Sequence, residues 1–333
     1  MKPLICAPMG DPAGIGPEIL AASLVDPVVT EAARVLVVGN TEIMRRAAAL
    51  MHVNPDFNEV DENLDGWREG AANILNMDNL DLADFAYGKI QGQCGKAAFE
   101  YIKKAVELTL AGKAHVLATT PINKESLKAG GVPYIGHTEI LGDLTGTADP
   151  LTMFQVHGLR VFFLSRHLSL VDACRAVKKD RVLDYLTRCT DAMRLLGIEN
   201  PSIVVAGLNP HCGEHGLFGN EEDVEIVPAI EEAKKRGLNA HGPNPADSVF
   251  HFALKGAWDA VLSLYHDQGH IATKMVDFER TISLTLGMPI LRTSVDHGTA
   301  FDIAGKGQAS AVSMVEAIRL AALYAPGFRH AHA

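Results

Sequence analysis

Three histidines each follow an apolar run that has the composition of a buried strand. His167 closes the segment VFFLSRH, His211 closes IVVAGLNPH, and His266 closes VLSLYH. In open α/β sheets the loops after the strands meet in one crevice, so three such side chains are expected to converge. Three imidazoles suit a divalent metal ion and leave coordination positions open for substrate and water. The pattern therefore predicts a metal site made by His167, His211 and His266.

A purely structural explanation competes with this prediction. The chain contains 14 histidines, and a single loop histidine is usually a surface or capping residue. The spacing matches neither a zinc finger nor the HExxH motif. The pattern nevertheless recurs at three strand ends, each time among small or turn residues, and this recurrence favours the metal site.

Four polar or cationic residues could hold an anionic substrate. GHTE places His137 and Thr138 at the expected start of a helix, where free backbone N–H groups attract anions. Thr138 could equally be a simple N-cap, with Glu139 in the first turn. Lys274 lies shortly after the histidine-rich loop YHDQGHI, and Arg292 interrupts an apolar strand. An arginine in such a strand suits phosphate or carboxylate recognition.

Two glycine-rich segments could contact a cofactor. MGDPAGIGPEI (residues 9–19) follows an expected strand and opens a helix, but its glycines do not form the G-x-G-x-x-G fingerprint of a Rossmann fold. SVDHGTAFDIAGKGQA (residues 294–309) joins a strand to a helix and could wrap a nucleotide with its backbone amides. A tight active-site turn explains this second segment as well, and is the more common explanation for such a motif alone.

The arrangement of apolar runs predicts an α/β protein with mostly parallel strands, because short β-branched runs alternate with longer segments of helical period. The strands are expected at 3–7, 34–38, 114–119, 151–156, 159–164, 202–206, 259–264 and 290–294. The helices are expected at 17–25, 41–51, 94–111, 169–177, 180–196, 222–236 and 308–324. His157-Gly158 suits a two-residue hairpin link. Gly- and Pro-rich stretches at 128–137 and 239–247 resemble linkers.

Composition limits the classes of function. At 333 residues, one large or two medium domains are expected, and 47 % hydrophobic residues supply an ample core. The net charge of −10 argues against a nucleic-acid or anionic-membrane partner, but a few local cations could still hold a small anion. Five scattered cysteines, a short N-terminal apolar run and no run of transmembrane length predict a cytoplasmic protein with reduced thiols. We expect the closing histidines, His330 and His332, to belong to a frayed tail.

The motifs together resemble the 4-hydroxythreonine-4-phosphate dehydrogenase family. MGDPAGIGPEI, TTPINKESL, GHTE, GLNPHCGE, YHDQGH and RTSVDHGTAFDIAGKG occur in that family's order over nearly the whole chain. The first and last are also similar to the GDGIGPE and HGSAPDIAGKG stretches of isopropylmalate dehydrogenases. The resemblance implies the two-domain α/β fold of isocitrate and isopropylmalate dehydrogenases, with the active site in the cleft between domains. One domain would comprise residues 1–125 and 285–333, and the other residues 126–284.

The resemblance also implies roles for individual residues and a homodimer with a shared active site. One divalent ion (Zn, Mg, Co or Mn) would be bound by His167, His211 and, from the partner subunit, His266. The substrate-binding positions would be His137, Thr138, Lys274, Ser283 and Arg292. NAD or NADP would contact the segment that contains Asp296, His297, Gly298, Thr299 and Asp302. Asp247 and Asp267 are candidates for proton transfer or for orienting a histidine.

The implied reaction is oxidation of the C3 hydroxyl of a 4-phosphorylated 3-hydroxy acid, followed by metal-assisted decarboxylation. Ser283 stands where the vitamin B6 branch commonly has Asn, and His270 stands where that branch often has Leu. Both departures favour the sister branch that oxidises D-threonate or D-erythronate 4-phosphate. A metal-dependent phosphatase or hydrolase acting on a small phosphorylated acid is the main alternative, and a catalytically silent binding protein is another.

Overall fold

The computed structural model describes residues 2–329, so His330 and His332 lie outside the described residues. The chain divides into two compact units: the first comprises Met1–Pro150 with Met288–Ala333, and the second comprises Leu151–Gly287. The first boundary lies at residue 150 rather than at the expected residue 125. Helices α5 (Lys124–Ala129) and α6 (His137–Thr145) pack against α4 (Gly92–Leu110), which places this stretch in the first unit.

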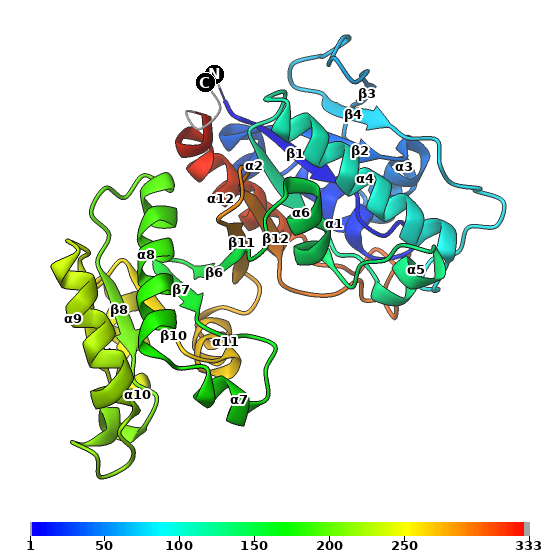
Figure 1. Cartoon of the computed structure of the whole chain (residues 1–333). Coiled ribbons are helices and arrows are strands. Elements are labelled where there is room, and N and C mark those ends of the chain that lie inside the picture. The colour runs from blue at the N-terminus through cyan, green and yellow to red at the C-terminus, as the bar shows by residue number, and fades with distance from the viewer. Residues whose placement is uncertain (1, 330–333) are drawn as a thin grey trace. The chain divides into compact units, whose positions relative to one another are not determined.

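The first unit contains parallel strands in the order β3-β4-β2-β1-β5-β12 (Figure 1). Their bounds are β1 Leu4–Pro8, β2 Arg34–Gly39, β3 Phe57–Glu59, β4 Ala72–Asn76, β5 Val116–Thr119 and β12 Arg292–Val295. The central strands β1, β2 and β5 are buried almost throughout, as expected where helices cover both faces of a parallel sheet.

Helices in the first unit pack on this sheet in two groups. One group is α4 with α5 and α6, and the other is α12 (Val312–Arg329) with α1 (Gly16–Ser23) and α2 (Pro27–Ala32). Helix α3 (Thr41–Leu50) is N-capped by Asn40, whose side chain accepts a hydrogen bond from the Ile43 N–H. Gly95 allows α5 to approach α4, because a Cβ there would lie only 1.9 Å from the Ser126 carbonyl oxygen.

The second unit is mixed. Its strand order is β11-β6-β7-β10-β8-β9, with antiparallel pairing among β11, β6 and β7 and parallel pairing among β7, β10, β8 and β9. Their bounds are β6 Leu151–Val156, β7 Leu159–Phe163, β8 Ile203–Ala206, β9 Ala240–Asn244, β10 Ala260–Ser263 and β11 Ile282–Leu286. The predicted hairpin at His157-Gly158 is confirmed, since it joins β6 to β7.

Helices α8 (Lys179–Leu195) and α9 (Val227–Lys235) pack together in the second unit (Figure 1). The other helical elements are α7 Leu170–Arg175, the 3₁₀ turn η1 Pro210–Gly213, the π-helical turn η2 Glu222–Ile226, α10 Ala246–Leu254 and α11 His266–Val276. Two expectations need correction. The linker expected at 239–247 contains β9, where Pro243 is tolerated because β9 is an edge strand. The segment YHDQGHI, expected as a loop, comprises the N-cap Tyr265 and the first six residues of α11.

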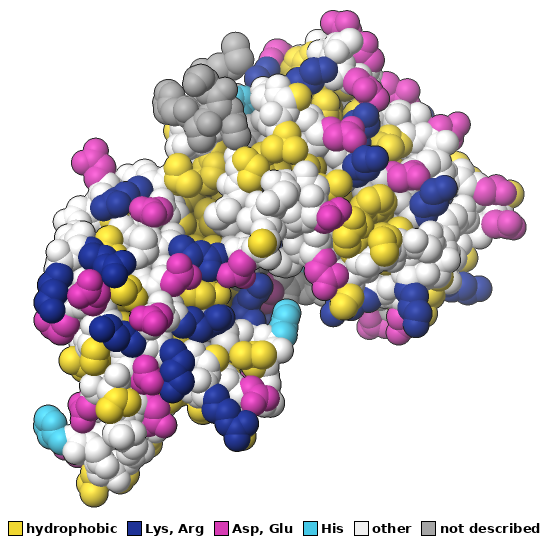
Figure 2. All heavy atoms as spheres, viewed as in Figure 1, with side chains coloured by type: hydrophobic (Ala, Val, Ile, Leu, Met, Phe, Trp, Pro, Cys, Tyr) yellow, Lys and Arg dark blue, Asp and Glu magenta, His cyan; other side chains and the backbone are white. Residues whose placement is uncertain are grey.

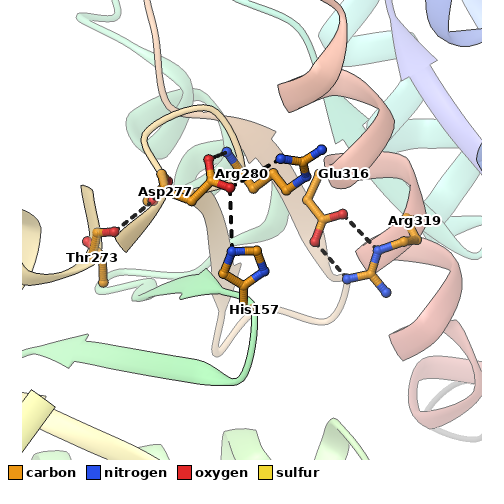
Figure 3. A network of polar contacts seen from close by, with 7 residues as sticks. His157, Thr273, Asp277, Arg280, Glu316 and Arg319 are labelled. Atoms are coloured by element: carbon orange, nitrogen blue, oxygen red, sulfur yellow. Dashed lines mark hydrogen bonds and ion pairs between the residues drawn. The ribbon is translucent and has the colours of Figure 1, made fainter. Parts of the chain in front are cut away.

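An exposed polar network fixes the end of α11 (Figure 3). Asp277 accepts hydrogen bonds from the Arg280 backbone N–H (3.0 Å) and guanidinium (3.2 Å), and lies 3.4 Å from His157 Nε2 in the hairpin turn. The Arg280 backbone N–H is the main cause of a lowered Asp277 pKa. In the first unit, Glu316 and Arg319 form a separate ion pair within α12, at 2.7 Å.

The α/β prediction with mostly parallel strands is confirmed, and all eight predicted strands are present with ends shifted by no more than two residues. On the face that Figure 2 shows, basic and acidic side chains are interspersed. Within residues 2–329, no helix is both long and apolar enough to cross a membrane. All five cysteines are free thiols.

Candidate functional site

The three strands that precede the predicted metal ligands are neighbours in the sheet of the second unit. Strand β10 lies between β7 and β8 and is parallel to both. His167 follows β7, His266 follows β10 and His211 follows β8. Because the strands are parallel, the three histidines follow strand ends at the same edge of the sheet, as the sequence predicts.

His266 is held in place by two neighbouring side chains. Its Nδ1 atom lies 2.6 Å from Oδ1 of Asp267, and its ring stacks on that of His270, with centroids 3.8 Å apart and an interplanar angle of 10°. The His270 ring also contacts Phe154 and Phe163, at centroid distances of 4.3 and 4.4 Å. The carboxylate and the stacked ring together fix the imidazole and leave Nε2 free to bind a metal.

His167 and His266 fit two positions of a divalent metal site. Their ring centroids are 6.3 Å apart within one chain, whereas two imidazoles on one tetrahedral zinc ion would have centroids roughly 5 Å apart, given zinc–nitrogen bonds of about 2 Å. The observed centroids are thus roughly 1 Å farther apart than in such a site. His266 lies beside His167 of its own chain.

The structure does not bring His211 into this pair as a complete ligand set. Among residues 2–329, no group of three His, Cys, Asp or Glu side chains surrounds a common point at ligand distances. His211 lies in the exposed turn η1, with φ of 51° in the left-handed region. The three-histidine metal site thus stays a prediction, supported by strand order and by the His167–His266 pair.

A buried carboxylate that sequence reasoning missed supports the His211 turn. Glu222, 2 % exposed, accepts hydrogen bonds from the backbone N–H groups of Leu208 and Asn209, both at 2.7 Å, and from the Asn209 side chain at 2.9 Å. Cys212, like His211, has a left-handed backbone (φ 57°), a conformation that costs free energy in non-glycine residues. Glu222 begins the π-helical turn η2, and such turns often occur at functional sites.

Asp247 and Asp267 line one hollow of about 390 Å³ in the second unit, together with Tyr265, Gln268 and Ile271. Gln268 joins the ends of two strands, since its side chain accepts from the Leu264 N–H (2.7 Å) and donates to the Gly207 carbonyl (2.8 Å). The geometry distinguishes the two carboxylates: Asp267 is engaged with His266, whereas Asp247 lies in the first turn of α10.

The predicted substrate-binding residues are distributed over both units. In the second unit, Lys274 lies on α11 with its Nζ atom 5.2 Å from the centroid of the Phe278 ring, and Ser283 lies on β11 opposite Phe154. His137, Thr138 and Arg292 belong to the first unit. The structure therefore provides two groups of candidate residues, each placed within its own unit.

His137 and Arg292 are the basic residues of the first-unit group. His137 and Thr138 begin α6, as expected. The His137 side chain is half-buried, but its Nε2 atom is enclosed and has no hydrogen-bond partner in the structure. Burial, and then the charge of Arg292, lower the His137 pKa, so the imidazole is neutral. Arg292 is only 6 % exposed and donates to the Thr119 hydroxyl at 2.8 Å.

The predicted cofactor residues form a segment after β12, at the carboxyl end of the strand. His297 Nδ1 lies 3.1 Å from the Gly298 carbonyl, and the Asp302 carbonyl accepts from Lys306 Nζ at 2.6 Å. Thr299 is buried and its carbonyl accepts from the Ile15 N–H at 3.0 Å. Asp296 directly follows β12. The segment is thus ordered against the glycine-rich stretch at 9–19.

Asp11, in that stretch, is a buried carboxyl that sequence reasoning missed. It is 0 % exposed, and only its Oδ1 accepts a hydrogen bond, from the Ala13 N–H at 2.9 Å. Burial raises its pKa to about 6, against the lowering effects of the Ala13 N–H and the nearby Ser126 hydroxyl. Asp11 Oδ2 and Ser126 Oγ are both buried, and neither has a hydrogen-bond partner. A buried, perturbed carboxyl at a sheet edge is typical of functional sites.

Comparisons with known proteins show the family of the chain. The family model "Pyridoxal phosphate biosynthetic protein PdxA" matches residues 31–321. A relative from Halalkalibacterium halodurans, named "Putative D-threonate 4-phosphate dehydrogenase", is 59 % identical over 330 residues, which cover 98 % of both chains. A relative of the same name from Clostridium botulinum is 58 % identical over 329 residues, again 98 % of both chains.

A solved structure matches the whole fold. The crystal structure of a 4-hydroxythreonine-4-phosphate dehydrogenase from Klebsiella pneumoniae has a TM-score of 0.90 and 38 % sequence identity, and the match covers 98 % of both chains. The fold is therefore that of this group of proteins.

Asp11→Asn should stabilise the protein in a pH-dependent way. Because the folded-state pKa is raised from 3.8 to about 6, ionised Asp11 costs stability above pH 6, and this cost disappears as the pH falls to 4. Asparagine keeps the acceptor for Ala13 and carries no charge. We expect a gain of up to about 3 kcal/mol at pH 8 and almost none at pH 4, measured by urea unfolding. The exposed Asp84→Asn is the control, and an equal effect of Asp11→Asn at both pH values would contradict the prediction.

Proposed function

Because the chain belongs to the family of the pyridoxal phosphate biosynthetic protein PdxA, we propose that it is an NAD(P)-dependent dehydrogenase acting on a 4-phosphorylated 3-hydroxy acid. Hydride would pass from C3 to the nicotinamide ring, and the resulting β-keto acid would lose carbon dioxide. The observation that carries the proposal is the His167–His266 pair at the strand ends, with Asp267 behind His266.

His167, His211 and His266 would hold one divalent metal ion. A bound cation of this kind lowers the pKa of a hydroxyl and stabilises the negative charge left when carbon dioxide departs. Asp267 holds the His266 ring with Nε2 available. Since Asp267 is occupied in this way, Asp247 on the same hollow is the candidate that accepts the proton of the C3 hydroxyl.

The phosphate would be bound by Arg292, Lys274, His137 and Thr138. Arg292 supplies a permanent buried charge, and neutral His137 supplies an imidazole that hydrogen-bonds without adding charge. Anchoring the far end of the substrate orients C3, and orientation of reacting groups can supply several kcal/mol of the barrier, with about 7 reached in well-ordered cases. The segment from Asp296 to Asp302 would contact the dinucleotide.

We propose D-threonate or D-erythronate 4-phosphate as substrate, in preference to 4-hydroxythreonine 4-phosphate. The relatives at 58 and 59 % identity are named for D-threonate 4-phosphate. Ser283 and His270, the two departures from the vitamin B6 branch, both lie in the second unit, where His270 stacks on His266. The candidate substrates share the carboxylate, the 3-hydroxyl and the phosphate, so the C2 hydroxyl or amine distinguishes them.

A homodimer is the proposed assembly. Helix α11 exposes Ile271 (61 %) and Met275 (80 %), and the exposed Phe278 (64 %) follows just after the helix ends. Positions i and i+4 lie on one face of a helix, and an exposed apolar face of this kind typically marks an interface. Ile271 also lines the hollow that contains Asp247 and Asp267, so a second subunit on this face would lie next to the site.

His211→Ala should abolish turnover and lower the bound metal, with little change in NADH affinity. The reason is that it removes one proposed ligand without touching the segment at 296–302. Metal content by elemental analysis and NADH binding by fluorescence titration check the two parts separately. His251→Ala, on α10, is a matched control because it removes an imidazole of the second unit outside the proposed ligand set. Retention of both metal and activity in His211→Ala would show that the site is misassigned.

An NAD-reduction assay should distinguish the candidate substrates. We expect kcat/KM to be highest for D-threonate or D-erythronate 4-phosphate and at least about tenfold lower for 4-hydroxythreonine 4-phosphate, since one misplaced polar group costs over 1 kcal/mol. Preference for the amine substrate would contradict the substrate assignment. Phosphate release without dinucleotide reduction would instead support a metal-dependent phosphatase.

A further inference from the structure

A buried carboxylate connects the first glycine-rich stretch to the last one. Glu18, in the first turn of α1, is 0 % exposed. Its Oε1 atom accepts a hydrogen bond from the Gly305 backbone N–H at 2.6 Å, and its Oε2 atom accepts one from the Gly307 N–H at 2.9 Å. Hydrogen bonds from N–H groups to a carboxylate are stronger than those to a neutral acceptor. One side chain therefore holds two alternate residues of a segment that lies 287 residues away in sequence.

The held segment has a backbone path that only glycine adopts readily. Gly305 and Gly307 have φ angles of 78° and 63°. A Cβ on Gly305 would lie 2.7 Å from the Tyr87 ring, and a Cβ on Gly307 would lie 2.2 Å from the Leu50 carbonyl oxygen. Both N–H groups point to Glu18 because of this turn. The residues of AGKG are thus fixed by close packing on one side and by a carboxylate on the other.

A second contact fixes the start of the same segment. The Ile15 N–H donates to the Thr299 carbonyl at 3.0 Å, and the Gly14 Cα packs so closely on Thr299 that a Cβ would lie 2.8 Å from the Thr299 Cβ. The stretch at 13–18 therefore holds the segment at Thr299 and again at Gly305 and Gly307. The residues between these points, including Asp302, have little freedom to change their path.

We propose that Glu18 is a positioning residue for dinucleotide binding, which keeps the segment 299–307 in its binding conformation before the cofactor arrives. This inference rests on the proposed contact between the segment and NAD or NADP. The motif MGDPAGIGPEI does not form a Rossmann-type turn. Its role in this proposal is to hold the cofactor segment in one conformation.

The physical reason is preorganisation. A loop that is ordered only part of the time binds its ligand with an affinity reduced by that fraction, and ordering it in advance removes this loss. A glutamine at position 18 can accept only one N–H, and its amide NH₂ group would face the other N–H. Glu18→Gln should therefore release one end of the turn without changing the size of the side chain.

The test compares Glu18→Gln with Ser23→Ala. Ser23 is a buried residue of the same helix whose hydroxyl donates to the Leu20 carbonyl, so its loss affects α1 without touching the segment. NADH and NADPH are titrated by fluorescence. We expect Glu18→Gln to raise the dissociation constant of the bound dinucleotide about tenfold or more, as for a segment ordered a tenth of the time. Ser23→Ala should change it less than about twofold, and metal content should stay unchanged in both.

Hydrogen exchange of the peptide 301–308 gives a readout that needs no turnover. In the wild type without dinucleotide we expect slow exchange at Gly305 and Gly307, and in Glu18→Gln fast exchange there. If Glu18→Gln does not fold, the wild type alone provides the test. Fast exchange of its Gly305 and Gly307 amides until NADH is added would overturn the inference. Equal NADH affinity in wild type and Glu18→Gln would also overturn it while leaving the proposed function intact. A wild type that binds neither NADH nor NADPH would overturn both.

Discussion

Parallel strands end at a common edge, and the arrangement of both candidate groups depends on this constraint. In the second unit, β7, β10 and β8 are adjacent and parallel, so residues from three distant parts of the chain follow one another along that edge. In the first unit, β1, β5 and β12 are likewise adjacent and parallel. Asp11, Asn123 and Thr299 follow these strands, and the Asp11 N–H donates to the Pro121 carbonyl at 3.1 Å. Each unit therefore gathers polar side chains without needing them close in sequence.

Carboxylates that bind backbone N–H groups stabilise the segments at these edges. Glu222 holds the turn before His211, Glu18 holds the glycine turn after β12, and Asp11 holds its own loop through Ala13. Buried carboxylates cost free energy unless they are hydrogen-bonded. These carboxylates lie beside segments that must keep one conformation. Glu222 supports left-handed residues, and Glu18 supports a glycine turn.

Much of the fold was predictable because its central strands are short, continuous apolar runs. β8 and β10 are buried along their whole length, and their sequences IVVA and AVLS are almost entirely apolar. Four strands, β3, β4, β9 and β11, have no counterpart among the predicted ones. β3 has only three residues and a half-exposed surface, and β9 contains Pro243 at an edge. β4 and β11 are largely buried, and nothing in their burial explains why they were missed. The start of α11 carries no capping signal of a helix in the sequence, because Tyr265, at its N-cap position, makes no side-chain cap.

The candidate site was predictable where side-chain type and strand position coincide. His167 and His266 are brought together as expected, and His137 begins a helix next to the charge of Arg292. Glu18 and Glu222 could not be found in this way, since their partners are backbone groups far away in sequence, and a backbone N–H leaves no pattern of residue types. The cleft between domains stays a prediction.

The most direct measurement is anomalous X-ray diffraction from crystals soaked with Zn²⁺ or Co²⁺. We expect one strong peak about 2.0–2.3 Å from ring nitrogens of His167, His211 and His266, with Asp267 still bonded to His266 Nδ1. Those three imidazoles can come from one chain or from two chains of a dimer. A fully occupied ion bound elsewhere, with these rings free of metal, would contradict the account.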